Sequence, residues 1–373
     1  MAFEFITDAL NERQAQHLLR QRVVVQNNSA RVIEIADHQF LNFASNDYLA
    51  LGDEPLPLIT RRSGASSSPL VTGYQACHQQ LEQRFCDLLG YEAAMLFGSG
   101  FSANISVLKA LFNEAPDGFI VQDKLNHASL IDGGLQANAQ MQRFNHNNLS
   151  HLQARLEKSK SRNKLVVSEG VFSMDGDCAP VADIKALCQH QGAWFMLDDA
   201  HGFGVKGNGL GCGATTKPDI LVITFGKALA CNGAIVLSSK PVIDLLLQNN
   251  RDYIYSTAIS PMSCEVADHR LTQVLAADDK RAHLSDLISY FKSRCADEGL
   301  ALMDSDTPIQ PLIIGDSEGA LNAQQALRKQ GIWLSAIRPP TVAHNTARLR
   351  ITLNSAHTHQ DIDTLVNALR SCQ

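Results

Sequence analysis

The sequence contains no long hydrophobic run and only a small excess of negative charge. None of its apolar segments approaches the ~20 residues that a membrane helix needs, and its first residues have neither the basic nor the apolar region of a signal peptide. We therefore expect a cytoplasmic protein that does not bind a membrane. With 32 Lys and Arg against 38 Asp and Glu, the net charge of -6 leaves no basic excess to hold a phosphate backbone. Nucleic acid is therefore not an expected partner.

The nine cysteines form no C-x-x-C pair. They are an odd number scattered from Cys77 to Cys372, which predicts reduced, mostly buried thiols. None of the ligand spacings typical of a zinc site is present either. From spacing along the chain, no metal site is expected.

The 373 residues are 45% hydrophobic and 19% charged, which is typical of a globular protein long enough for two domains. Apolar periodicity predicts a helix over the first thirty residues. Short apolar runs then alternate with helical stretches, which predicts an α/β domain with a central, mostly parallel sheet covered on both faces. After residue 245, longer helices and a few strands predict a smaller α+β domain. The predicted divisions are 1–45 (N-terminal helix and short strands), 46–245 (large domain) and 246–373 (small domain).

Two short motifs in the large domain follow predicted strands. Residues 98–104 (Gly-Ser-Gly-Phe-Ser-Ala-Asn) join a strand to a helix, where backbone N–H groups can bind phosphate, although such glycines are more often simple turn residues. Asp198 and His201 follow the apolar run 194–197. A carboxylate at a strand end can hold a protonated ring nitrogen, and an imidazole can reach a nearby oxygen. Taken alone, a helix N-cap is the stronger interpretation of Asp198.

Two further signals complete the pattern. Lys227 closes the predicted strand 220–225, three residues after Thr224. A lysine among small and apolar residues can serve as an amine nucleophile, whereas most lysines in turns are simply solvated. His127 follows another strand and can stack on a planar ring, although an isolated histidine is usually only packed. Together, the four signals occur in the order used by pyridoxal 5'-phosphate (PLP) enzymes of the aspartate-aminotransferase fold.

Longer segments extend this pattern. Residues 42–49 (NFASNDYL), 169–177 (EGVFSMDGD), 198–202 (DDAHG) and 224–227 (TFGK) resemble motifs of the α-oxoamine synthases, and the resemblance covers nearly the whole chain. This family joins an amino acid to an acyl-CoA with loss of CO₂. The resemblance implies an acyltransferase of PLP fold type I, with an aspartate-aminotransferase-like large domain and a smaller α+β domain, that works as a homodimer.

The resemblance also assigns roles by position. It implies that Lys227 forms the Schiff base with PLP, Asp198 pairs with the pyridinium nitrogen, His201 hydrogen-bonds the ring hydroxyl and His127 stacks on the ring. These four are the candidate catalytic residues. The remaining candidates for cofactor binding are Gly100, Phe101, Ser173 and Thr224, with Thr257 reaching the phosphate of the neighbouring subunit. The candidates for substrate binding are Arg338, which would hold the amino-acid carboxylate, and Arg20, Asn46, Thr341 and His127.

Segments near the C-terminus favour one member of the family. Residues 309–313 (IQPLI), 337–342 (IRPPTV) and 347–350 (ARLR) resemble the member that condenses L-alanine with a pimeloyl thioester in biotin biosynthesis. The acyl carrier is either CoA or an acyl carrier protein.

Two alternative functions stay open. One is the member that joins glycine to acetyl-CoA, 2-amino-3-oxobutyrate CoA ligase. The other is a non-catalytic protein with the PLP fold, which the intact set of four candidate catalytic residues argues against.

Two loops depart from the family pattern. The glycine-rich loop before the helix at residue 78 here reads SGASSSPLVTG over residues 63–73, and the glycines usual after the lysine are replaced in residues 228–233 (ALACNG). Residues other than glycine rarely adopt positive φ. We therefore expect altered substrate preference or rate.

Overall fold

The computed structural model describes residues 2–115 and 117–372. The chain divides into two compact units. Unit 1 comprises the residues up to Asp53, the short segment Met174–Asp177 and the residues from Ala282 onward; unit 2 comprises Glu54–Ser173 and Cys178–Arg281. The sequence predicts a separate N-terminal part and a boundary near residue 245. In the structure, the N-terminal segment belongs to the same unit as the C-terminal residues, and the second boundary lies after Arg281.

Unit 2 is built on a sheet of seven strands, counted over the described residues, in the order β4-β10-β9-β8-β7-β5-β6. Neighbouring strands from β9 to β6 pair in parallel, and only β10 runs antiparallel to its neighbours. This confirms the predicted mostly parallel sheet. The polar edge strand β6 has no counterpart in the prediction, because it lacks a continuous apolar run. The strands are β4 (Ala93–Phe97), β5 (Gly118–Asp123), β6 (Gln140–Phe144), β7 (Asn163–Glu169), β8 (Ala193–Asp198), β9 (Ile220–Thr224) and β10 (Ala234–Ser238).

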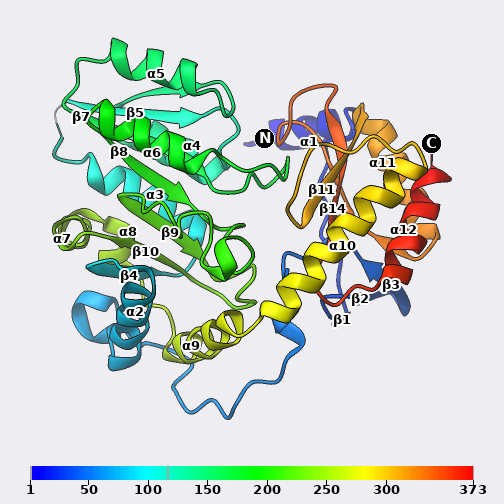
Figure 1. Ribbon diagram of the computed structural model, residues 1–373, viewed down its shortest axis with the longest axis horizontal. Coiled ribbons are helices and arrows are strands. Elements are labelled where there is room, and N and C mark those ends of the chain that lie inside the picture. The colour runs from blue at the N-terminus through cyan, green and yellow to red at the C-terminus, as the bar shows by residue number, and fades with distance from the viewer. Residues whose placement is uncertain (1, 116, 373) are drawn as a thin grey trace. The chain divides into compact units, whose positions relative to one another are not determined.

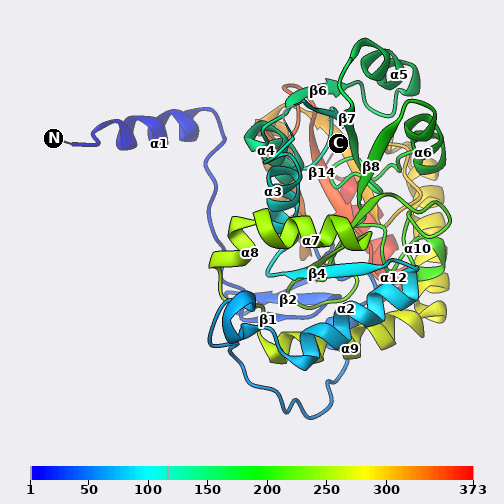
Figure 2. The same cartoon turned by 90° about the vertical axis from the view of Figure 1, so that its left-hand side faces the viewer.

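Helices cover both faces of this sheet (Figure 1). One layer consists of α3 (Gly100–Leu111), α4 (Ala128–Gln136), α7 (Lys240–Asn249) and α8 (Arg251–Tyr255). The other consists of α2 (Ala76–Leu89), α5 (Leu149–Lys158) and α6 (Val181–His190), and α9 (Pro261–Leu275) packs on α2 (Figure 2). This arrangement is the two-sided cover that parallel sheets require.

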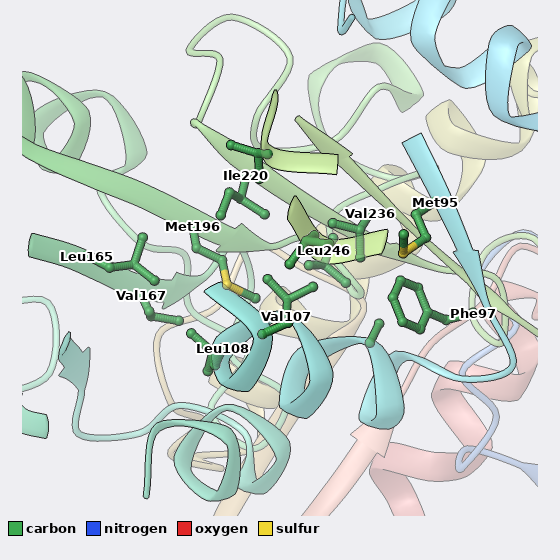
Figure 3. Packing of buried hydrophobic residues seen from close by; sticks show 14 of the residues in the cluster. Met95, Phe97, Val107, Leu108, Leu165, Val167, Met196, Ile220, Val236 and Leu246 are labelled. Carbon is green, nitrogen blue, oxygen red and sulfur yellow. The ribbon is translucent and has the colours of Figure 1, made fainter. Parts of the chain in front are cut away.

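The main core of unit 2 lies between the sheet and α3. Figure 3 shows Val107 and Leu108 of α3 among apolar side chains of the strands, including Leu165, Met196 and Val236. Every residue of β9 is buried, so the strand has no solvated face. Burial of each such aliphatic side chain contributes roughly 1.5–3 kcal/mol. The sheet is therefore a rigid support for the residues at its strand ends.

Unit 1 holds two smaller sheets, with orders β1-β2-β3-β12 and β11-β14-β13. The sequence predicts one strand over residues 332–337. The structure divides it, because β12 pairs with β3 whereas β13 pairs with β14 of the other sheet. The strands are β1 (Asn27–Asn28), β2 (Val32–Ile35), β3 (His38–Asn42), β11 (Ile309–Gly315), β12 (Ile332–Trp333), β13 (Ser335–Ile337) and β14 (Ala347–Thr352). The helices are α1 (Phe5–Ala15), α11 (Ser317–Lys329), α12 (His359–Arg370) and most of α10 (Asp278–Asp297), whose first residues belong to unit 2.

The N-terminal helix is much shorter than predicted, and the predicted apolar face is wrong. Helix α1 ends at Ala15, and none of its residues is buried. His17 adopts a left-handed φ of 57°, and the N–H of Leu18 donates to the carbonyl of Arg13 at 2.7 Å. These two features form a local helix stop of the Schellman type.

The 20-residue helix α10 buries one apolar face. Its buried residues Leu284, Leu287, Ile288, Phe291 and Cys295 recur at helical spacing, and the remaining positions are largely polar. Within the described part of the chain, no helix combines the length and the apolarity needed to cross a membrane.

Candidate active site

A cavity of about 250 Å³ lies in unit 2 where the carboxyl ends of β7, β8 and β9 meet the amino end of α3. Carboxyl ends of parallel strands are the usual place for ligands in open α/β sheets. The cavity brings together most of the residues that the sequence predicts for catalysis and cofactor binding: Gly100, Phe101, His127, Asp198, His201, Thr224 and Lys227.

Lys227 is half-buried and follows the end of β9. Its Nζ donates to Oγ1 of Thr224 at 3.5 Å. The amino end of α3 comes very close to the same strand end, since a Cβ on Gly100 would lie 2.2 Å from Cγ2 of Thr224. Only glycine fits there. The residues that start α3 line the cavity, and the free N–H groups of a helix start can bind an anion.

Asp198 ends β8 and is buried. Its Oδ2 accepts a hydrogen bond from Nδ2 of Asn104 at 2.6 Å, and its Oδ1 accepts one from the backbone N–H of Ala200 at 3.0 Å. The residues that follow form turns, so Asp198 does not cap an α-helix. The N-cap interpretation of the sequence is wrong, and the carboxylate lines the cavity instead.

Asn104 has no role in the sequence analysis, yet it links two parts of the site. Its Nδ2 also donates to Oγ of Ser129 at 3.0 Å, and that oxygen lies 2.8 Å from Nδ1 of His127. Nδ1 accepts the backbone N–H of Ser129 as well, which places the imidazole proton on Nε2. Asn104 thus fixes both the carboxylate and the imidazole. The only sequence signal for the role of Asn104 is its position in the motif 98–104, on the buried face of α3.

His127 caps α4, and its ring lies near that of Phe101, with 6.0 Å between centroids and an edge-on angle of 82°. The surrounding protein atoms desolvate the imidazole and lower the pKa of His127. Asp198 opposes this shift and Lys227 adds to it. At neutral pH the ring is therefore uncharged, which suits stacking on a flat partner.

Glu169 is a second residue that the sequence analysis leaves without a role. It ends β7 beside Asp198 of β8, and its Oε1 accepts the backbone N–H of His127 at 2.5 Å. Burial, followed by the neighbouring charge of Asp198, raises the pKa of Glu169 well above its usual value. The position of Glu169 at the start of the motif 169–177 was the available signal.

The remaining predicted cofactor residues lie in different places. His201 is buried and lines the cavity. Ser173 is buried too, close after the end of β7. Thr257 is exposed and borders another cavity of unit 2, of about 160 Å³, together with Gly98 and Ser102. Thr257 does not line the 250 Å³ cavity around Lys227 of the same chain, which is called the Lys227 cavity below.

Apart from His127, which lines the cavity of unit 2, the predicted substrate residues belong to unit 1. Nη2 of Arg20 donates to Oγ1 of Thr341 at 3.3 Å, and Arg338 donates to the carbonyl of His17. Partial burial lowers the pKa of Arg338, and the positive charge of Arg20 adds to this effect. Asn46 contacts a different arginine, since its Oδ1 accepts both Nη groups of Arg350 at 3.2 Å.

Comparison with known proteins assigns the chain to a family. The model of aminotransferase class I and II matches residues 38–369. The chain is 45% identical to an 8-amino-7-oxononanoate synthase of Sodalis glossinidius, over 99% of this chain and 97% of the relative. It is 44% identical to the enzyme of that name from Vibrio vulnificus, over 98% and 97%. The chain belongs to the 8-amino-7-oxononanoate synthase family.

Solved structures of this class of enzymes agree on the fold. A serine palmitoyltransferase from S. paucimobilis with a bound PLP–myriocin aldimine superposes with a TM-score of 0.90 at 25% identity, over 99% of this chain and 97% of that structure. The 8-amino-7-oxononanoate synthase of Francisella tularensis superposes with a TM-score of 0.75 at 28% identity, over 89% and 97%. The fold is therefore PLP fold type I, as predicted. The choice between members of this class of enzymes depends on the full-length relatives at 44–45% identity, because the solved structures are more distant in sequence.

Proposed function

We propose that this chain condenses L-alanine with a pimeloyl thioester, releasing CO₂ and the free thiol of the carrier, to give 8-amino-7-oxononanoate for biotin synthesis. The observation that carries the proposal is identity of 44–45% along the whole chain to relatives with that name. The Lys227 cavity supports it, because it supplies an amine, a buried carboxylate and an anion-binding helix end within one unit.

The residues of the cavity fit PLP. Asp198, held by two donors, would keep a proton on the pyridine nitrogen, and the amino end of α3 with Thr224 would bind the phosphate. When bound, PLP supplies an electron sink for the carbanion at the substrate α-carbon. His127, fixed through Ser129 and Asn104, would cover one face of the ring.

Lys227 would hold the cofactor covalently and then act as a base. Once the substrate amine has displaced it, Nζ would take the proton from the α-carbon of alanine. The neighbouring hydroxyl of Thr224, 3.5 Å from Nζ, would orient the amine for this transfer. With PLP bound, loss of this proton would allow the α-carbon of alanine to bond to the thioester carbonyl carbon, with release of the thiol and of CO₂.

Arg338 and Arg20 are the proposed carboxylate-binding residues of unit 1. Partial burial, and then the nearby charge of Arg20, lowers the pKa of Arg338, and a bound carboxylate would offset both effects. A guanidinium binds a carboxylate through two parallel hydrogen bonds, which fixes the orientation of the bond to be broken. Alanine and the pimeloyl chain both offer such a group.

The chain is further proposed to act as a cytoplasmic homodimer. Thr257 is exposed and lies outside the Lys227 cavity of its own chain, which suits a role at the phosphate of a partner subunit. Most soluble homo-oligomers are two-fold symmetric, so both sites would be completed in the same way. Sedimentation of the active species tests this, and activity in a 40.7 kDa monomer would contradict it.

The deciding experiment compares kcat/KM for two substrate pairs. Purified protein with PLP is given L-alanine and pimeloyl-CoA, or glycine and acetyl-CoA, and the products are identified by mass spectrometry. We expect a clear preference for the first pair, and the same assay with pimeloyl carrier protein identifies the natural carrier. Preference for glycine and acetyl-CoA would assign the chain to the ligase alternative. Absence of turnover with every pair, despite bound PLP, would support the non-catalytic alternative.

A further inference from the structure

Two cysteines and a histidine meet in the interior of unit 2, away from the residues that line the Lys227 cavity. Cys77 and His78 lie on α2, and Cys264 lies on α9, which packs against α2 (Figure 2). All three are buried, with exposed fractions of 8%, 2% and 1%. Their sulfur and nitrogen atoms all lie within 4.8 Å of one another.

The spacing of these atoms is close to that of metal ligands. Sγ of Cys77 lies 3.7 Å from Nδ1 of His78, and the two thiols contact each other. With Zn–S near 2.3 Å and Zn–N near 2.0 Å, sulfur and nitrogen ligands of a tetrahedral site lie about 3.5 Å apart. The Cys77–His78 distance is already close to this value, and all three atoms lie within 4.8 Å of one another, so the side chains would close on one ion by a small movement.

The imidazole of His78 is oriented as a ligand is. Its Nε2 lies 2.8 Å from the carbonyl oxygen of Ile259, which can only accept, so the ring proton is on Nε2. Histidines that bind metals usually donate their second nitrogen to such an acceptor. Nδ1 keeps its lone pair on the side of Cys77, where it accepts the backbone N–H of Gln75 at 3.0 Å. An ion would take the place of that one hydrogen bond.

The two thiols lie at the starts of their helices, and a cavity reaches the imidazole. Cys77 lies in the first turn of α2 and Cys264 in the first turn of α9. His78 also borders the cavity of about 160 Å³, with Glu82 one helical turn further on. This cavity offers an entry path and room for a fourth ligand, either the Glu82 carboxylate or water.

We propose that Cys77, His78 and Cys264 form a binding site for one thiophilic cation of the Zn²⁺ class, which joins α2 to α9. Binding would transfer the two thiol protons to solvent and form two metal–thiolate bonds and one metal–imidazole bond. Spacing along the sequence does not reveal the site, because its ligands come from two helices far apart in the chain. The three ligands are not among the proposed catalytic residues, and the test of the site does not depend on turnover; Thr257 borders the same 160 Å³ cavity as His78.

The test is titration of the purified holoenzyme with Cd²⁺, followed by its ultraviolet thiolate-to-metal absorption and by equilibrium dialysis. We expect one high-affinity ion per chain. Cys77→Ser and Cys264→Ser should each weaken binding at least tenfold and remove part of the thiolate band. Cys188→Ser, which removes a buried thiol of α6 in the same unit, should bind as the wild type does. Wild-type affinity in both of the first two variants would overturn the proposal.

A measurement on the wild type covers the case in which the serine variants do not fold. X-ray absorption of the Zn²⁺-loaded protein should show two sulfur neighbours and at least one nitrogen neighbour around the metal. A shell of oxygen and nitrogen alone, or failure to retain one ion per chain through dialysis, would overturn the proposal as well.

Discussion

The two units present their candidate functional residues in different ways. In unit 2, Asp198 and Asn104 are buried and hydrogen-bonded at the ends of rigid strands and helices. In unit 1, Arg20 lies on the segment between α1 and β1, which has no regular secondary structure, and Arg338 follows the short strand β13. The proposed cofactor residues are thus fixed by the fold, whereas the proposed carboxylate-binding residues are held by few contacts.

This difference suggests a division of labour that kinetics can resolve. Groups that are fixed in advance stabilise charge that develops during the reaction, so their loss should mainly lower kcat. Side chains that become ordered when a substrate binds contribute chiefly to substrate affinity, so their loss should mainly raise KM. The predictions below test the contrast, from the largest expected effect to the smallest.

Lys227→Ala should abolish turnover, because no other amine takes its place in the cavity as proton acceptor. The visible absorption of the cofactor should change at the same time, since the covalent attachment is lost. Lys240→Ala removes a solvent-exposed lysine of unit 2 that pairs only with Asp244 and is the matched control, with activity unchanged. Normal turnover in the Lys227 variant would contradict the preformed site.

Asp198→Asn should keep the fold and lose roughly 3–4 kcal/mol of transition-state stabilisation, the scale of a preorganised electrostatic contact. The amide keeps the shape of the side chain but removes the charge that holds the pyridinium proton. The loss should appear in kcat, with KM for alanine little changed. A rate within a fewfold of the wild type would show that the carboxylate does not have this role.

The interior of unit 1 should make folding pH-dependent. Burial lowers the pKa of His357 to about 4, against a smaller opposing effect of Asp361. Between pH 6.5 and 4 the unfolded chain binds this proton and the folded chain does not, so stability falls as pH falls. The expected loss over that window is about 3 kcal/mol.

Urea unfolding at pH 7.5 and 4 measures this loss, with His357→Gln as the comparison. The imidazole stacks on Phe43 at 4.4 Å and bonds to the backbone of Asn42 and Asn354, so the variant is less stable at neutral pH. Its stability should nevertheless depend less on pH than that of the wild type. If the free energy of unfolding changed equally with pH in the wild type and in the variant, groups other than His357 would control the acid sensitivity of unit 1.

Arg338→Gln should raise KM for alanine by a factor that corresponds to about 2 kcal/mol, the value of a charge-assisted hydrogen bond. Cofactor absorption should be retained, because Arg338 belongs to unit 1 and the cofactor residues to unit 2. Arg22→Gln, an exposed arginine of the same N-terminal stretch as Arg20, is the control. A loss confined to kcat would remove the proposed distinction between the units.

The sequence predicts the local features well and the long-range contacts poorly. Continuous apolar runs predict β7, β8 and β9, and Lys227 and Asp198 are visible because each follows such a run. Asn104 and Glu169 are missed because their roles depend on partners up to 94 residues away. The N-terminal helix is overpredicted as well, because apolar periodicity does not reveal the turn at His17 that ends α1.

The loop after Lys227 provides the smallest expected effect. The sequence lacks the glycines of the family there, yet Ala230 adopts a left-handed φ of 50°. Its N–H donates to the carbonyl of Lys227 at 2.8 Å, so the turn is kept without glycine. This conformation costs an L-residue about 1–2 kcal/mol, whereas glycine loses roughly 0.5–1 kcal/mol through its greater freedom when unfolded.

Ala230→Gly should therefore stabilise unit 2 by up to ~1 kcal/mol, which a small rise in Tm would report. The control in the same loop is Ala228→Gly. Ala228 is buried against Gly204 and does not share the positive φ, so removing its methyl group should lower Tm. If both variants lowered Tm alike, Ala230 would store no strain. If Ala230→Gly also left kcat/KM for alanine and pimeloyl-CoA unchanged, the replaced glycines would not explain an altered rate.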